Sequence, residues 1–451
     1  MKLEANSTTL PRALSPDIDV SLERDVPAER HYTLNGKPER MAWVVLFGAF
    51  FVCIALSLAV PFLGWQFLRF STIPQTASAE SSPVRTDQVT PVRVTLPNVT
   101  LPIAVIEPTN IPENSRIETD TTDNVRAGVI FFDQSNVTLY KDTQIILTEM
   151  RQPQFGLSEL PNSIIVEQTR GRAIYAVSLP LPVFGNSSTR AKQFLVRTPQ
   201  FDVWLNPGSY TIEVNADASQ VSVIDGSAIT RSRDGSREFF IGERQRVVAQ
   251  TGKPLADPIP AAQDLLVNGD FAEPIDCTPN AQGAWKCYSD QGGDGGDVNG
   301  SIGAVTLDNR RGIQIKREGS NQNSAITGIR QILDRDVSYY RDLKLSASVR
   351  VENHSLSGGG YLSTEYPLIL RVRYRDVNGD EAEYVRGFYT QNENKNPTAN
   401  GEILKAGRWN TIVSSNLLAL PIKPFRILAI EIYGSGWDYE SYISNVQLRA
   451  E

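Results

Sequence analysis

The sequence predicts a mainly β protein with a single transmembrane helix, a Pro-rich stalk and two successive β domains. Three observations support this fold class. Residues 41–68 carry no charged side chain, residues 69–123 contain seven prolines, and the chain after residue 124 consists of short runs rich in β-branched residues, separated by turn residues. The expected parts are a disordered cytoplasmic tail at 1–40, the helix at 41–68, the stalk at 69–123, the first β domain at 124–253, a linker at 254–263 and the second β domain at 264–451.

The uncharged stretch is long enough to cross a membrane as a helix. A bilayer core of about 30 Å needs about 20 apolar residues, and this stretch has 28 between Arg40 and Arg69. Trp43 and Trp65 are 22 residues apart, or about 33 Å along a helix, which places one indole at each membrane interface. A buried core helix is the alternative, but such helices rarely run this far without a polar face.

The basic residues around this helix predict its orientation. Four precede it within about 20 residues and two follow it, namely Arg24, Arg30, Lys37 and Arg40 before it and Arg69 and Arg85 after it. Because Lys and Arg are retained on the cytoplasmic side, we expect a cytoplasmic N-terminus and extracytoplasmic β domains in the cell membrane.

A cleavable signal peptide is the competing interpretation of the same stretch. The Ala-Ser-Ala motif at 77–79 has the small-x-small pattern of a cleavage site. However, signal peptides have apolar cores of about 7–15 residues, and the motif lies well beyond the end of this longer run. We therefore favour an uncleaved anchor. Pro61 lacks the backbone donor of an intrahelical hydrogen bond, so we expect it to bend the helix or to mark its outer end.

Composition and motifs argue against two classes of function. The net charge of −7 is unsuited to nucleic acid, because phosphate binding requires a basic surface. The sequence contains two histidines, His31 in the tail and His354 in an expected loop, and it lacks the G-x-S-x-G, H-E-x-x-H and P-loop patterns. We therefore expect no nucleic-acid partner and no enzymatic activity.

The three cysteines fall in two places. Cys53 lies inside the apolar helix, where it acts as a small apolar residue. Cys277 and Cys287 are ten residues apart on the side assigned as oxidising, so we predict a disulfide that closes a short loop and contributes about 3 kcal/mol. A metal pair is the alternative, although no other cysteine or nearby histidine completes such a site.

Two segments are predicted to lack a fold of their own. Residues 1–40 are polar, with mixed charge and no sustained apolar periodicity, and are expected to be disordered. The proline-rich residues 69–123 are expected to form an extended stalk, because proline at this density blocks helices and central strands. Alternating apolar residues at 92–105 leave room for short strands that dock on the next domain.

The first β domain carries a resemblance to a known family. The matching pieces are AGVIFFDQSNVTLYKDTQIIL (127–147), RGRAIYAV (170–177), FLVRTPQFDVWLNPGSYTIEVN (194–215) and the V-x-V-x-x-G-x-A hairpin at 221–228. Their order resembles the FecR-type extracytoplasmic domain, the sensor half of membrane-spanning regulators. The resemblance implies an all-β domain. Two departures concern signalling: residues 206–209 are Asn-Pro-Gly-Ser where family members carry Arg-Gly-Thr, and the tail shows no anti-sigma helix module.

The second β domain carries another resemblance. It opens with VNGDFAEP (267–274) followed by Trp285, contains GRW (407–409) and ends with SYISNVQL (441–448). This arrangement resembles the galactose-binding-like jelly roll of carbohydrate-binding modules. The resemblance implies a β-sandwich that binds carbohydrate and keeps Trp285 and Trp409 in its core. Within this domain, Asn378-Gly379 between two alternating segments predicts a β-hairpin.

Calcium is a further expectation, with alternatives left open. In the jelly-roll family the first and last strands share a structural calcium; Glu273 would supply one carboxylate, while Ser444 and Asn445 stand where an acidic residue is expected. A separate glycine-rich loop at 289–301 gathers possible oxygen ligands, namely Asp290, Asp294 and Asp297. Their spacing differs from the D-x-D-x-D-G loop, so a solvated surface loop is the favoured interpretation.

Carbohydrate binding requires aromatic faces presented to solvent. Tyr361 and Tyr366 lie in the glycine-rich segment SGGGYLSTEY (357–366) and are expected to be exposed, and Trp437 and Tyr439 are further candidates. We therefore interpret the chain as a membrane-anchored bacterial cell-envelope protein that binds carbohydrate or a cell-wall polymer. Two alternatives remain, namely FecR-like signalling through the tail and a structural role in which the sandwich binds a protein partner.

Overall fold

The computed structural model describes residues 37–82, 89–122, 125–156, 158–180, 191–280, 282–291 and 298–451. The chain divides into two compact units, Met1–Phe67 and Leu68–Glu451. The first unit contains most of the only helix longer than one turn among the described residues, and the second contains all the described strands. The expected tail lies largely outside the described residues, at 1–36.

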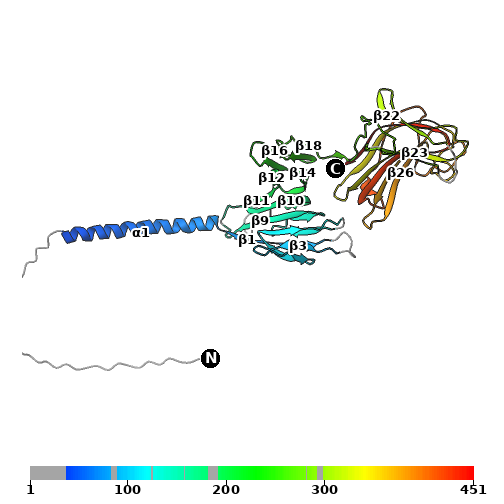
Figure 1. Cartoon of the computed structure of the whole chain (residues 1–451). Coiled ribbons are helices and arrows are strands. Elements are labelled where there is room, and N and C mark those ends of the chain that lie inside the picture. Colours follow the sequence, from blue (N-terminus) through cyan, green and yellow to red (C-terminus); the bar gives the residue numbers. More distant parts are fainter. Residues whose placement is uncertain are drawn as a thin grey trace, which may run out of the picture. The chain divides into compact units, whose positions relative to one another are not determined.

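Helix α1 (Lys37–Phe70) is the membrane-spanning candidate (Figure 1). Its Arg40–Phe70 portion has 31 residues; the most apolar 18-residue window within it has a mean hydropathy of 2.6, and none of that window is buried in protein. Trp43 and Trp65 are both exposed. The helix continues through Pro61 and ends at Phe70, so Pro61 does not mark its outer end. By length and composition, this helix near the N-terminus can cross a bilayer core of about 30 Å.

Strands β1 to β18 form what we call the N-terminal β unit. Their bounds are β1 (Thr72–Pro74), β2 (Thr76–Ser81), β3 (Val92–Thr95), β4 (Ile103–Val105), β5 (Thr109–Pro112), β6 (Ser115–Glu118), β7 (Ala127–Ile130), β8 (Asn136–Leu139), β9 (Gln144–Pro153), β10 (Asn162–Val177), β11 (Lys192–Arg197), β12 (Phe201–Leu205), β13 (Gly208–Val214), β14 (Ala218–Asp225), β15 (Ala228–Ser232), β16 (Glu238–Ile241), β17 (Gln245–Gln250) and β18 (Ile259–Pro260). Their pairings connect into one closed barrel.

The long strand β10 joins two ladders of this unit. Its first half pairs with β9 and β11, and its second half pairs with β8 and β13. The change occurs at Gly171, where φ is +83° and a Cβ atom would lie 2.4 Å from the carbonyl oxygen of Asp142. Only glycine fits this bend without strain. The bend lets alternate side chains of both ladders share one hydrophobic core.

The stalk prediction for residues 69–123 is wrong. These residues contribute β1 to β6, and Ala77, Ile111 and Ile117 are fully buried in the core of the N-terminal β unit. Five of the seven prolines lie at strand borders and do not interrupt the strands: Pro74 and Pro112 end strands, and Pro91, Pro102 and Pro108 directly precede them. Proline is compatible with strand ends and edges, where no ladder donor is needed.

Strands β19 to β30 form the C-terminal β-sandwich. Their bounds are β19 (Gln263–Asp264), β20 (Lys286–Asp290), β21 (Ser301–Leu307), β22 (Arg310–Arg317), β23 (Ala325–Asp336), β24 (Leu343–His354), β25 (Leu368–Arg375), β26 (Glu381–Tyr389), β27 (Gly401–Ile403), β28 (Asn410–Val413), β29 (Arg426–Gly436) and β30 (Tyr439–Ala450), with the 3₁₀ helix η1 (Leu417–Ala419). One sheet has the order β21-β22-β30-β24-β28 with β19 beside β30, and the other has the order β20-β23-β29-β25-β26-β27. The two sheets enclose a single core.

These elements confirm the mainly β fold class with one long apolar helix. The hairpin prediction at Asn378-Gly379 is also confirmed, because β25 and β26 pair antiparallel with Arg375 opposite Glu381, and Gly379 adopts φ +88°. In the segment expected as a linker, β18 pairs with β17 of the N-terminal unit, and β19 begins at its end and pairs with β30.

The opening of the sandwich is held by Trp285 and a disulfide. Trp285 is buried in the core, as predicted, and its indole Nε1 donates to the carbonyl oxygen of Asn268 at 3.0 Å. Cys277 and Cys287 form a disulfide, which ties the loop before β20 to that strand. Trp409 differs from the prediction, because it is only half-buried and lies outside the core cluster.

Candidate functional site

The structure separates the four aromatic residues expected to contact ligand. Tyr361 is 82% exposed at the tip of its loop, and Trp437 is half-buried. Tyr366 and Tyr439 are each only 1% exposed, so the expectation that Tyr366 is exposed is wrong and Tyr439 presents no open ring face. Of the four, Tyr361 is the one exposed residue, and Trp437 is exposed only in part.

Tyr366 is buried because three glycines leave room for its ring. A Cβ atom at Gly359, Gly387 or Gly401 would lie between 2.1 and 2.5 Å from an atom of Tyr366. The ring stacks at 5.9 Å on Tyr389, and the hydroxyl donates to the carbonyl oxygen of Ala399. Tyr366 therefore fastens its loop onto the sheet.

The ring of Tyr439 likewise occupies space that a glycine leaves free. A Cβ at Gly434 in β29 would lie 2.3 Å from the Tyr439 ring. A glycine in a strand interior often marks the close approach of another group. Such glycines were the sequence signal that could have identified both tyrosines as structural residues.

The candidate calcium ligands do not form a metal site among the described residues. Glu273 is exposed, and its backbone N–H and C=O bond to the side chain of Asn268. Ser444 donates to the carbonyl oxygen of Arg311 at 2.6 Å. Asp290 ends β20, whereas Asp294 and Asp297 lie outside the described residues. In the described parts of the chain no cluster of three His, Cys, Asp or Glu side chains is suited to hold a metal ion.

A polar cluster that sequence reasoning missed lies on the sheet of β20, β23, β29 and β25. Side chains alternate between the two sides of a strand, and Ile430 and Ile432 enter the core, so Glu431 and Tyr433 lie on the opposite face. The register places Arg330 and Arg371 directly beside Glu431. We call this cluster the Glu431 face; its members are Tyr288, Arg330, Arg371, Glu431 and Tyr433.

Glu431 is fully buried and is compensated by arginines. Nε of Arg371 donates to its Oε2 at 2.6 Å, and Nη2 of Arg371 contacts the same oxygen. Nε of Arg330 lies 2.5 Å from Oε1, in an ion pair without hydrogen-bond alignment. Because a buried carboxylate is tolerated only when it is paired, Glu431 fixes the positions of both guanidinium groups.

The two arginines also cover the two tyrosines. The guanidinium carbon of Arg330 lies 4.9 Å from the centre of the Tyr288 ring, and that of Arg371 lies 5.0 Å from the centre of Tyr433. Such contacts are attractive cation–π interactions. Even so, 36% of the Arg330 side chain and 25% of the Arg371 side chain remain exposed, so both can still meet a ligand.

Tyr288 adds an unused hydrogen-bonding group. Its hydroxyl is buried and has no hydrogen-bond partner among the described residues. Burial raises the pKa of Tyr288, so the hydroxyl stays protonated and can donate at neutral pH. The Glu431 face thus combines fixed guanidinium donors, a free hydroxyl and aromatic edges, which together suit a hydroxyl-rich ligand.

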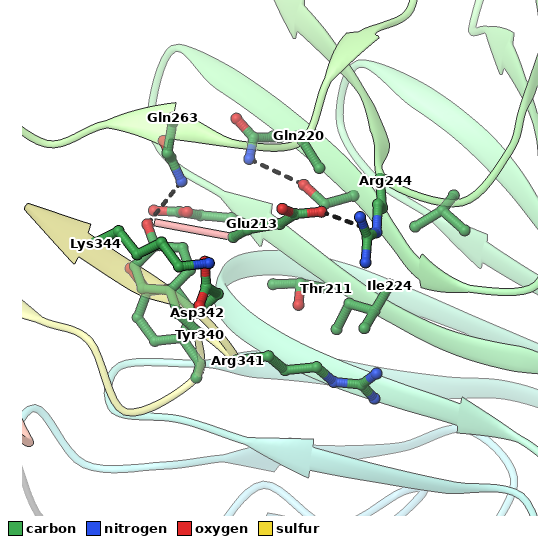
Figure 2. A pocket seen from close by; sticks show the side chains of 15 residues that line it. Thr211, Glu213, Gln220, Ile224, Arg244, Gln263, Tyr340, Arg341, Asp342 and Lys344 are labelled. Atoms are coloured by element: carbon green, nitrogen blue, oxygen red, sulfur yellow. Dashed lines mark hydrogen bonds and ion pairs between the residues drawn. The ribbon is translucent and has the colours of Figure 1, made fainter. Parts of the chain in front are cut away.

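A cavity of about 360 Å³ lies elsewhere in the Leu68–Glu451 unit (Figure 2). Its lining residues come from β13, β14, β19, β24 and the segments beside them, namely Thr211, Glu213, Gln220, Ser222, Val223, Ile224, Arg244, Ala261, Gln263, Tyr339, Tyr340, Arg341, Asp342, Lys344 and Glu451. In Figure 2, Gln263 reaches Tyr340, and Nε2 of Gln263 donates to the Tyr340 hydroxyl at 2.6 Å.

Comparisons with known proteins give low similarity. No protein-family model matches the chain, and no curated protein matches it. A putative anti-sigma factor from Parabacteroides distasonis ATCC 8503 is 18% identical, with 35% of this chain and 69% of that chain covered and a TM-score of 0.24. The family 11 carbohydrate-binding module of Lic26A-Cel5E from Clostridium thermocellum is 15% identical, with 42% and 93% covered and a TM-score of 0.24.

A further solved structure is TmCBM61 in complex with β-1,4-galactotriose. It is 12% identical, with 42% of this chain and 99% of that chain covered and a TM-score of 0.24. At these scores none of the three likenesses carries a function over to this chain.

Proposed function

We propose that this protein is a membrane-anchored binding protein that recognises carbohydrate or another hydroxyl-rich cell-envelope polymer through the Glu431 face. The observation that carries the proposal is the pair Arg330 and Arg371, which the buried carboxylate of Glu431 holds in place while their side chains stay partly exposed. A donor array fixed before binding loses little conformational entropy when a ligand arrives.

The chemistry of the face suits sugar hydroxyl groups. Each sugar hydroxyl donates and accepts hydrogen bonds, and the guanidinium groups and the Tyr288 hydroxyl supply donors. The hydroxyl of Tyr288 has no partner among the described residues, and a ligand oxygen would give it one. The resemblance of residues 264–451 to carbohydrate-binding jelly rolls points to the same class of ligand.

The membrane anchor and the disulfide support an extracytoplasmic location. Helix α1 is long and apolar enough to span a bilayer, and most of the nearby basic residues precede it. Disulfides persist in oxidising compartments, and Cys277–Cys287 lies in the C-terminal β-sandwich. The sandwich would then face outward, where envelope polymers are found.

We propose binding without catalysis. His354, the only histidine among the described residues, accepts backbone N–H bonds from Thr390 and Gln391 at Nε2. Its Nδ1 must donate to the carbonyl oxygen of Leu356, so both ring nitrogens are engaged and neither is available as a general base.

The test is a pull-down of the full-length chain, in a detergent without a sugar headgroup, on cell-wall preparations and insoluble polysaccharides. Retention on at least one polymer is expected. It should fall in Arg330→Gln and in Tyr288→Phe, and remain unchanged in Arg408→Gln, a control at an exposed arginine of the same sandwich. Tyr361→Ala tests the exposed loop tip separately. If no polymer retains the chain, or if both face variants bind as the wild type does, the proposal fails.

A further inference from the structure

We propose that the cavity of Figure 2 is a second ligand site, which binds a neutral saccharide of one or two rings. This proposal does not depend on the Glu431 face, because the two share no residue. The volume of about 360 Å³ lies within the range of small-molecule sites, about 300–1,000 Å³.

The charges around the cavity favour a ligand without net charge. Three basic and three acidic side chains line it, namely Arg244, Arg341 and Lys344, and Glu213, Asp342 and Glu451. Several are already paired: Arg244 lies 3.3 Å from Glu451, and Lys344 lies 2.8 Å from Asp342. Because three positive and three negative side chains balance, the lining carries no net charge to attract an ionic ligand, and among the described residues Arg341 is the one lining cation without an ion-pair partner.

Glu213 is also engaged. Its carboxylate lies 2.9 Å from Nη2 of Arg172, so it is held at the wall by a cation outside the lining. Beyond these pairs the wall presents the guanidinium of Arg341 and the amide and hydroxyl groups of Gln220, Gln263 and Thr211. Amides offer both donors and acceptors, which match hydroxyl groups that do the same.

Tyr339 supplies the observation that points to a ligand. It lines the cavity and is 8% exposed, and its hydroxyl makes no hydrogen bond of standard geometry among the described residues, with the side chain of Tyr340 as its only polar interaction of that kind there. A buried polar group without a well-formed hydrogen bond is costly. Burial raises the pKa of Tyr339, so the hydroxyl is a donor at neutral pH. A ligand oxygen in the cavity would satisfy it.

The ring of Tyr339 is rigidly held. The guanidinium carbon of Arg172 lies 3.6 Å from its centre, and the centre of the Tyr340 ring lies 4.2 Å away. Tyr340 is in turn fixed by the hydrogen bond from Gln263. The cavity therefore offers pre-positioned aromatic rings beside polar groups, the combination that saccharide sites use to bind the apolar and polar sides of a sugar ring.

The experiment uses the full-length chain in a detergent without a sugar headgroup, because a sugar headgroup would compete. Calorimetric titration would measure the binding of lactose, cellobiose, N,N′-diacetylchitobiose and their monosaccharides, with glucuronate and glucosamine as charged comparators. We expect at least one neutral saccharide to bind more tightly than the charged ones. Tyr339→Phe, which deletes only the hydroxyl, should weaken its binding by about tenfold, and Ile224→Trp, which fills the cavity, should abolish it.

Matched controls separate this site from the Glu431 face. Tyr374→Phe removes a hydroxyl that bonds to the carbonyl oxygen of Ile422, away from the cavity lining, and should leave saccharide binding unchanged. Arg330→Gln should lower polymer retention without altering cavity binding, and Tyr339→Phe should do the reverse. The inference is overturned if no neutral saccharide binds more tightly than about 10 mM, if a charged comparator binds more tightly, or if Tyr339→Phe binds as the wild type does.

Discussion

Two buried carboxylates, Asp133 in the N-terminal β unit and Glu431 in the C-terminal β-sandwich, form similar ion pairs but differ in whether their cationic partners reach solvent. Asp133 of the N-terminal β unit forms an ion pair at 2.8 Å with Lys192, and their side chains are only 1% and 5% exposed. Lys192 also donates to Ser178, while Asp133 accepts from Ser135. Glu431 is equally buried, but its arginine partners extend to the surface.

The two ion pairs differ in how exposed the cationic partner of the carboxylate is. The ammonium of Lys192 is enclosed with its serines, so no group of that cluster is left for a ligand, and the pair acts only on stability. The guanidinium groups of Arg330 and Arg371 each have several donors, so they can hold Glu431 and still reach outward. Burial of a charge is thus uninformative about function until the exposure of its partner is known.

The largest effect is expected for Lys192→Met. This change leaves Asp133 buried without its cation, and breaking one side of a buried ion pair costs about 3–5 kcal/mol. Urea unfolding monitored by circular dichroism would measure the loss of unfolding free energy. The control is Arg170→Met, which removes a half-exposed partner of Asp142 and should cost about 0–1 kcal/mol. Equal losses in the two variants would contradict the comparison.

The disulfide provides a reference for the stability of the sandwich. Cys277→Ser opens a loop with a sequence separation of 10, and the loop-entropy relation gives a loss of about 3 kcal/mol. The unfolding transition of the sandwich should shift, while that of the N-terminal β unit stays in place. A shift in both transitions would mean that the two parts unfold together.

Glu431→Gln should destabilise less than Lys192→Met. The amide keeps the shape of the carboxylate but loses its charge, and the freed guanidinium groups can hydrate because they reach solvent. A loss of about 2 kcal/mol is expected, typical for hydrogen bonds to charged groups, together with weaker polymer retention. A loss as large as that of Lys192→Met would remove the distinction between the two carboxylates.

The smallest effect concerns His354, a buried titratable group that must stay neutral. Burial lowers its pKa, and a proton on Nε2 would oppose the N–H groups of Thr390 and Gln391. Its contribution to stability is therefore complete above the unfolded pKa of about 6.5 and is lost as the pH falls from there through the folded value. Denaturation at a series of pH values should show this slope in the wild type and not in His354→Gln.

Local signals in the sequence predicted local features well. The charge-free run became α1, Asn378-Gly379 became a hairpin, and Trp285 lies in the core. Each of these depends on residues close together in the chain. The proline-rich segment failed as a stalk because counting prolines ignores where they fall relative to strand borders.

The site could not be predicted for a related reason. Tyr366 is buried through glycines at 359, 387 and 401, and this match depends on the folded register. Glu431, Arg330 and Arg371 come from three strands, each of which alone shows an ordinary alternation of apolar and charged residues. Only the pairing of the strands reveals that these charges meet.

The shortness of β1 has a mechanical consequence. If the C-terminal part holds a fixed polymer while the helix stays in a membrane, a pull enters the N-terminal β unit through the contacts of Arg69 and Ser71 with Glu159 and Gln154 and through β1, whose three residues pair with β9. No β1 residue belongs to the buried core. Under tension these surface contacts and β1 would separate first and lengthen the tether by about 10 Å, while β2 to β17 keep their ladders, so the first response to load is a small extension.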